Sequence, residues 1–150
     1  MRTPATDAMW AAFRAARPDV AGDYDVVSFG DGPALAEELA QLVLHGPKRA
    51  TAGLLRDFGE AEPLPRIGGH VVVLGGDGTP RGVWRTTEVR VGPLSSVDEA
   101  FAWDEGEGDR TREGWLRMHR TFFARQAERE GFRITDDEPI MFERFELVWP

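Results

Sequence analysis

Residues 70–91 read HVVVLGGDGTPRGVWRTTEVRV, two strand-like runs separated by a glycine-rich turn. The first run, His70–Leu74, is almost entirely apolar, which is typical of a strand buried on both faces. Gly75–Gly78 supplies the turn, and Arg81–Val91 returns as the second strand of a hairpin. Closely spaced short strands of this kind favour a barrel over a doubly wound sheet.

The pattern around this hairpin predicts three longer helices and three further strands. The helices repeat apolar residues at helical spacing over Thr6–Ala16, Pro33–Gly46 and Thr111–Glu130. The strands are expected at Tyr24–Phe29, Ala50–Leu55 and Ile140–Trp149. Ser96 and Glu99 fit a capping box that opens a short helix. We therefore predict an α+β fold, a small mixed β-barrel with flanking helices, in which residues 1–23 form an N-terminal helical extension to a domain of residues 24–150.

Composition narrows the class of protein. At 150 residues and 41% hydrophobic content, the chain has the size of one compact domain. The absence of cysteine excludes a disulfide framework, a Cys-based zinc site and a thiol nucleophile. The start of the chain lacks the features of a signal peptide, and no apolar run approaches the roughly 18 residues of a membrane span. We therefore expect a soluble, cytoplasmic protein with no membrane partner.

The net charge of −8 bears on the partners. Proteins that bind long nucleic acids without sequence preference usually present a basic face and gain affinity by releasing counterions. An acidic chain repels a polyanion at long range. Contact with nucleic acid therefore requires a local pocket, and a small uncharged nucleoside is the easier ligand.

The first candidate site is His45–Thr51, in which Lys48 follows a helix end and Thr51 comes three residues later. This spacing can hold an ammonium near a hydroxyl. A partly desolvated lysine gives up its proton more readily, and it can act as an acid, a base or an anion clamp. The alternative is that Lys48 and Arg49 complement the negative end of the helix and that Thr51 is an ordinary strand residue.

The second candidate site is Trp103–Asp109, which places four acids in six positions with two glycines among them. One explanation is functional, since a carboxylate in such a loop can serve as a general acid or base. A divalent metal fits less well, because the loop lacks the residue order of a calcium loop. The alternative is structural, with Asp109 or Thr111 as the cap and the acids complementing the N-terminus of the following helix.

Three ring-bearing side chains complete the candidates. His119 lies between Trp115 and Phe122 on the apolar stripe of the long helix, where it is either a hydrogen-bonded core residue or a site residue. Trp84 and Trp103 are candidates for stacking on a nucleobase, since such stacking tolerates a weakly charged surface. The alternative is that both tryptophans belong to the core.

Several short segments, taken in order along the chain, carry a family resemblance: Ser28–Gly30, Gly46–Thr51, Pro63–Gly68, Glu105–Asp109, Trp115, His119–Phe123 and Glu143–Phe145. Together they resemble the ASCH domain family, and more narrowly its bacterial branch once described as a domain of unknown function. The resemblance runs from about Tyr24 to Trp149. It implies a β-barrel related to PUA domains, with a cleft beside the barrel at which RNA or nucleotide binding is suspected.

Some members of this family resemble enzymes. One branch removes an acetyl group from a modified cytidine with a lysine, a threonine three residues later and a glutamate after a short helix, and another member is similar to a ribonuclease. The resemblance places these roles on Lys48, Thr51 and Glu105, with Glu107 as the alternative carboxylate. The usual motif continues with an acid and an arginine after the lysine, which Ala50–Gly53 does not supply.

We therefore expect a hydrolase that acts on a modified nucleoside (an amide) or a short RNA. A non-catalytic module that binds RNA or a nucleotide is the alternative, and an acidic surface for a protein partner is a third interpretation. The expected catalytic residues are Lys48, Thr51 and Glu105, and the expected binding residues are Arg49, Trp84, Trp103, Glu107 and His119. No metal and no cofactor is expected, and the ligand is a nucleoside, nucleotide or short RNA. The sequence leaves the oligomeric state open, a homodimer included.

Overall fold

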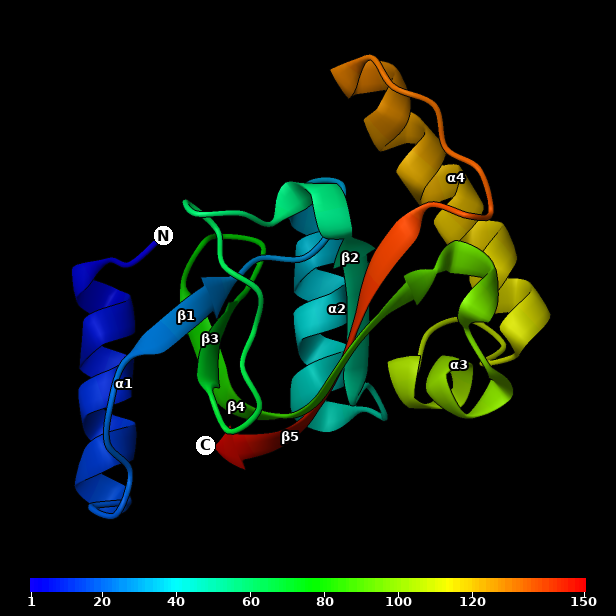
Figure 1. Cartoon of the computed structure of the whole chain (residues 1–150). Coiled ribbons are helices and arrows are strands. Elements are labelled where there is room, and N and C mark those ends of the chain that lie inside the picture. Colours follow the sequence, from blue (N-terminus) through cyan, green and yellow to red (C-terminus); the bar gives the residue numbers. More distant parts are fainter. The chain divides into compact units, whose positions relative to one another are not determined.

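The structure is a computed structural model that describes all 150 residues (Figure 1). In chain order its helices and strands are α1 (Pro4–Ala16), β1 (Tyr24–Val27), α2 (Pro33–His45), β2 (Ala50–Leu54), β3 (His70–Leu74), β4 (Pro80–Pro93), α3 (Glu99–Glu105), α4 (Arg112–Glu130) and β5 (Pro139–Trp149). Short 3₁₀ turns follow β2 at Leu55–Asp57 and β4 at Leu94–Ser96. The predicted helices and strands are all present. None of these helices combines the length and the apolar character that crossing a membrane requires.

The strands form a mixed sheet in the order β1-β3-β4-β5-β2. β1 runs parallel to β3, whereas the pairs β3–β4 and β2–β5 are antiparallel. The hairpin predicted at residues 70–91 is confirmed, with Val71 opposite Trp84 and Val72 opposite Val83. The predicted α+β class, with a mixed sheet and accompanying helices, is confirmed as well.

The chain divides into two compact units, which are described separately. The first unit contains residues 1–49, 66–87 and 145–150, and the second contains residues 50–65 and 88–144. α1, α2, β1 and β3 belong to the first unit, whereas α3, α4 and β2 belong to the second. β4 and β5 run from one unit into the other, so each unit holds a part of both strands.

In the first unit, β3 is buried on both faces. Side chains alternate across a strand, so neighbouring valines point to opposite sides. Val72 packs with Trp10 and Phe13 of α1. Val71 and Val73 pack with residues of α2 on the other face. Because both faces carry a helix, the strand needs the near-continuous apolar run that the sequence shows.

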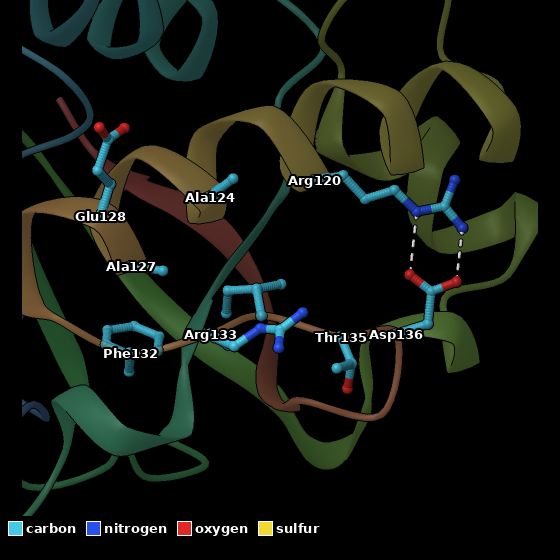
Figure 2. A pocket seen from close by; sticks show the side chains of 9 residues that line it. Arg120, Ala124, Ala127, Glu128, Phe132, Arg133, Thr135 and Asp136 are labelled. Carbon is cyan, nitrogen blue, oxygen red and sulfur yellow. Dashed lines mark hydrogen bonds and ion pairs between the residues drawn. The ribbon is translucent and has the colours of Figure 1, made fainter.

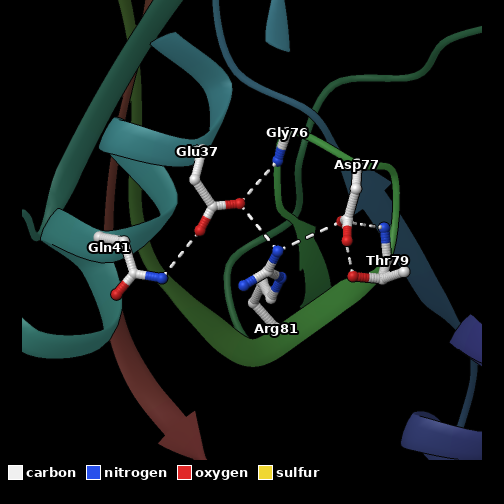
Figure 3. A network of polar contacts seen from close by, with 6 residues as sticks. All are labelled: Glu37, Gln41, Gly76, Asp77, Thr79 and Arg81. Carbon is white, nitrogen blue, oxygen red and sulfur yellow. Dashed lines mark hydrogen bonds and ion pairs between the residues drawn. The ribbon is translucent and has the colours of Figure 1, made fainter. Parts of the chain in front are cut away.

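A polar network in the first unit fastens α2 to the turn between β3 and β4 (Figure 3). Arg81 Nη2 donates to Glu37 Oε1 at 2.8 Å and to Asp77 Oδ1 at 3.2 Å. Glu37 Oε1 also accepts from the backbone N–H of Gly76 at 3.0 Å. Asp77 Oδ1 accepts in addition from the N–H and the hydroxyl of Thr79, at 3.0 and 2.6 Å. The arginine therefore joins one carboxylate of the helix to one of the turn.

This network predicts a pH dependence that is carried by Asp77. The hydroxyl and N–H of Thr79, followed by Arg81, lower the pKa of Asp77 from 3.8 to about 2. The unfolded chain has the ordinary pKa, so this carboxylate contributes its full stabilisation above that value and loses it as the pH falls through about 2. We expect the difference in unfolding free energy between wild type and Asp77→Asn to shrink between pH 5 and pH 2. Urea denaturation at four pH values checks this, and a constant difference would contradict it.

In the second unit, β2 and β5 form one wall of a separate core. Ala52 lies opposite Phe142 and Leu54 lies opposite Ile140, so these four side chains share a face of the strand pair. They pack with residues of α3 and α4, among them Phe101. α3 packs against both β2 and α4.

The capping box predicted at Ser96 and Glu99 is wrong, because α3 begins with a different cap. Ser96 lies in the 3₁₀ turn before the helix, and its hydroxyl donates to Pro93 O at 2.6 Å. Asp98 caps the helix instead, because its Oδ1 accepts from the N–H of Phe101 at 2.8 Å. Both Ser96 and Asp98 are good capping residues, so the local pattern alone did not separate them.

Candidate functional site

Lys48 lies just beyond the end of α2 in the first unit and is 1% exposed. The helix ends at Gly46, and the backbone N–H of Lys48 donates to Leu42 O at 3.2 Å. The ammonium nitrogen lies 5.4 Å from the centroid of the Phe29 ring. A lysine is almost never fully buried unless its charge is compensated, so this burial marks Lys48 as a residue with a specific role.

Lys48 is also the only lysine among the 18 lysine and arginine residues of the chain. Arginine stays protonated in proteins, whereas a desolvated lysine can release and regain a proton. The other 17 of these residues are arginine, and the one lysine is buried.

Arg49, next in the chain, serves the end of α2. Its Nη1 donates to Val43 O at 2.9 Å and to Lys48 O at 2.6 Å. Its own carbonyl accepts from the N–H of Phe145 at 3.1 Å. The structure therefore places the guanidinium on the negative end of the helix, where it satisfies carbonyls that lack intrahelical partners.

Glu105 is the last residue of α3, in the second unit, and is 1% exposed. Gly106 follows with a positive φ of 71° and ends the helix. The Glu105 carboxyl accepts a hydrogen bond from Trp115 Nε1 at its Oε2, with a distance of 3.0 Å. A carboxyl group this deeply buried is held by specific partners rather than by water.

His119 faces the other oxygen of the same carboxyl group. Its Nε2 lies 3.8 Å from Glu105 Oε1, and its ring stacks on Trp115 with centroids 3.8 Å apart and planes at 13°. Its Nδ1 lies 2.9 Å from the backbone oxygen of Trp115. A carbonyl oxygen can only accept, so Nδ1 carries a proton. The sequence placed His119 and Trp115 on one helical stripe, but it did not indicate that Trp115 donates to the candidate carboxylate.

Thr51 lies in β2 directly opposite Glu143 of β5. Directly opposite residues of an antiparallel pair place their side chains on the same face, about 4.5–5.5 Å apart at Cβ. Glu143 is 4% exposed and is therefore a second buried carboxyl group of the second unit. Sequence reasoning missed it as a site residue. One signal for it was available in the sequence. Phe142 and Phe145 lie on opposite faces of the strand and both are apolar, so neither face was clearly polar and Glu143 had no obvious solvent side.

The other acids near Glu105 have structural partners. Asp104 Oδ2 accepts from Arg144 Nε at 3.0 Å. Asp109 Oδ1 accepts from the N–H and hydroxyl of Thr111, and these contacts lower the pKa of Asp109. Thr111 in turn caps α4, as one of the predicted alternatives proposed. Glu107 is half-buried, and its backbone oxygen accepts from the N–H of Arg110 at 3.2 Å.

The two candidate tryptophans lie in different environments. Trp84 is 1% exposed, and its ring stacks on Phe145 with centroids 3.8 Å apart and planes at 8°. The buried ring offers no open face on which a nucleobase could stack, so Trp84 is not part of the candidate site. Trp103, by contrast, is 58% exposed.

Two surface hollows are lined by other residues. One, of about 420 Å³, is bordered by the second half of α4 and the segment that follows it, with Arg133 and the Arg120–Asp136 ion pair on its rim (Figure 2). The other, of about 290 Å³, is lined by residues 21–23 and 66–70 of the first unit. Neither hollow is lined by a predicted site residue. No group of three or more histidine, aspartate or glutamate side chains is arranged to hold a metal ion.

Comparisons with known proteins point to one family. The family model of the ASCH domain matches residues 25–149. The chain is similar to the crystal structure of an ASCH domain from Lactobacillus crispatus JV V101, with 26% identity over 99% of this chain and 96% of that chain, and a TM-score of 0.89. It is also similar to the crystal structure of a protein from Enterococcus faecalis V583 in a family of unknown function, with 30% identity, coverage of 95% and 87%, and a TM-score of 0.85. A search of curated proteins produced no match.

Proposed function

Because this chain belongs to the ASCH domain family, we propose that it binds a nucleoside or short RNA and hydrolyses it, the preferred substrate being a modified nucleoside that carries an amide. The observation that carries the proposal is the buried carboxyl group of Glu105 between Trp115 Nε1 and His119 Nε2. Such an arrangement is typical of acid–base sites and costs stability in a purely structural core.

Glu105 is the general base in this proposal. It takes a proton from an attacking water, or from the Thr51 hydroxyl, as the new bond to the amide carbon forms. The carbonyl oxygen then carries negative charge, which the ammonium of Lys48 stabilises. The carbon–nitrogen bond breaks and the amine leaves with the proton that the carboxyl group had taken. Where Thr51 is the nucleophile, the acyl group is left as an ester on its oxygen, and a water molecule deprotonated by Glu105 then hydrolyses that ester and restores the hydroxyl. α3 packs against β2, which supports the pairing of Glu105 with Thr51; the role of Lys48 rests on the resemblance and on its burial.

His119 positions the carboxyl group. With Nδ1 protonated toward Trp115 O, Nε2 is the ring nitrogen that faces Glu105 Oε1, and in a neutral ring it would carry a lone pair. Two acceptors repel each other, so this contact is favourable when a proton lies on the ring or on the carboxyl group. The pair therefore has a place for one proton, as the reaction requires.

The alternative function is a non-catalytic module for RNA or a nucleotide. The exposed ring of Trp103 favours it, because stacking on a base needs an open aromatic face and no catalytic group. Salt-sensitive binding without any product would support this alternative.

The test of the proposed hydrolase uses the pure protein with acylated nucleosides and with oligoribonucleotides. We expect product from one of these substrates, and we expect Lys48→Ala to lose about 10²-fold or more of the turnover. Lys48→Arg keeps the charge but cannot release a proton, so turnover retained in this variant supports charge stabilisation by Lys48, and turnover lost in it indicates that Lys48 also transfers a proton. Circular dichroism of both variants shows whether they fold. No turnover of either substrate, or full turnover after Lys48→Ala, would exclude the proposal.

A further inference from the structure

Trp103 is exposed on α3, although most tryptophans of this chain are core residues. It is 58% exposed, whereas Trp10, Trp84 and Trp115 are 8%, 1% and 2% exposed. A large aromatic ring that stays exposed contributes far less to the fold than a buried one, so its exposure is a reason to look for a ligand.

Arg110 holds this ring in place from one side. Its guanidinium carbon lies 3.6 Å from the centroid of the Trp103 ring, and its Nε donates to Trp103 O at 2.9 Å. Arg110 has a positive φ of 62°, which is uncommon for a residue with a side chain. The loop that carries Arg110 therefore adopts a less favourable backbone conformation in which the guanidinium lies over the indole ring.

The remaining donors of Arg110 suit a phosphate. Neither of its contacts uses the two terminal nitrogens, which carry four N–H groups in a planar fork. Two neighbouring carboxylates bind other groups, Asp104 on Arg144 and Asp109 on Thr111. An arginine fork matches two oxygens of a phosphate, and a positioned guanidinium loses little entropy when it binds one.

We propose that Trp103 and Arg110 form a binding site for a nucleotide, with the base stacked on the indole and the phosphate held by the guanidinium fork. The site differs from the candidate acid–base site, because Trp103 is exposed and Glu105, two residues later on the same short helix, is buried. The proposal rests on the proposed function and refines only the class of ligand. The ligand is then a phosphate-bearing nucleotide or RNA end rather than an uncharged nucleoside. Its ligand is short, because the net charge of −8 opposes a long polyanion.

Calorimetric titration with adenosine, adenosine 5′-monophosphate and inorganic phosphate tests this site. We expect the monophosphate to bind at least about tenfold more tightly than adenosine, and its affinity to fall as salt rises. Trp103→Leu should weaken both adenine ligands about tenfold or more. Arg110→Gly should remove the preference for the monophosphate, and glycine accepts the positive φ without strain.

Arg133→Gln is the matched control, since it removes the same charge from an exposed arginine of the second unit that has no aromatic partner. It should leave all three affinities unchanged. Wild-type affinities in Trp103→Leu and Arg110→Gly would overturn the proposal. Variants that only lower the melting temperature would overturn it too, because the stack would then merely hold the loop on α3. Loss of hydrolysis is not a readout here, so the failure of the hydrolase proposal leaves this test intact.

Discussion

Glu105→Gln is expected to lower hydrolytic turnover about 10²–10⁴-fold while the protein stays folded. Glutamine has nearly the size of glutamate, and its amide oxygen can still accept the hydrogen bond from Trp115 Nε1 that is 3.0 Å long in the native structure. It cannot take up a proton, so general base catalysis is lost. Initial rates with the best acylated nucleoside or oligoribonucleotide measure the loss.

Two further variants make this result specific. Glu113→Gln changes an exposed acid in the first turn of α4 and should retain wild-type turnover. Glu107→Gln tests the alternative carboxylate of the same loop. If Glu107→Gln abolishes turnover and Glu105→Gln does not, the general base is Glu107 and the assignment made here is wrong.

Trp84→Ala is expected to lower the free energy of unfolding by about 3–5 kcal/mol. The side chain is 1% exposed, stacks on Phe145 at 3.8 Å and lies 5.9 Å from the Phe29 ring. Its removal leaves a large cavity between β4 and the residues packed from α2 and β3. Domains of this size are stable by about 5–15 kcal/mol, so this loss is a large share of the total stability.

Trp103→Ala is the control for this measurement, because it deletes the same side chain from an exposed position. We expect a loss of about 0.5–1 kcal/mol, from the contact of the ring with Arg110. Urea denaturation of both variants gives the two values. Similar losses would mean that Trp84 is not a main element of the core of the first unit.

The helices and strands followed from local patterns because their causes are local. The apolar run at residues 70–74 predicted a strand buried on both faces, and α1 and α2 do pack on its two sides. The cap of α3 was the exception, since Ser96 and Asp98 compete for one position and the preceding 3₁₀ turn decides between them.

The residue types of the candidate site were predictable from the sequence, but the contacts between their side chains were not. Glu105 and Glu107 look alike in the sequence, yet only Glu105 is deeply buried, with Trp115 and His119 around its carboxyl group. The burial of Glu143 opposite Thr51 was not predictable, because it depends on the register of β2 and β5. Whether Lys48, Thr51 and Glu105 act together remains the prediction that the kinetic variants test.

Residue order alone was sufficient for the family, the α+β class and most boundaries of helices and strands, because periodicity, turn residues and short motifs are properties of neighbouring residues. Burial is different, since it depends on which distant segments pack together. Trp84 therefore lies in the core whereas Trp103 is exposed. In the same way Glu105 is buried whereas Glu107 is half-buried. Taking a charge out of water costs free energy and taking an aromatic ring out of water gains it, and both effects depend on the packing of the folded chain.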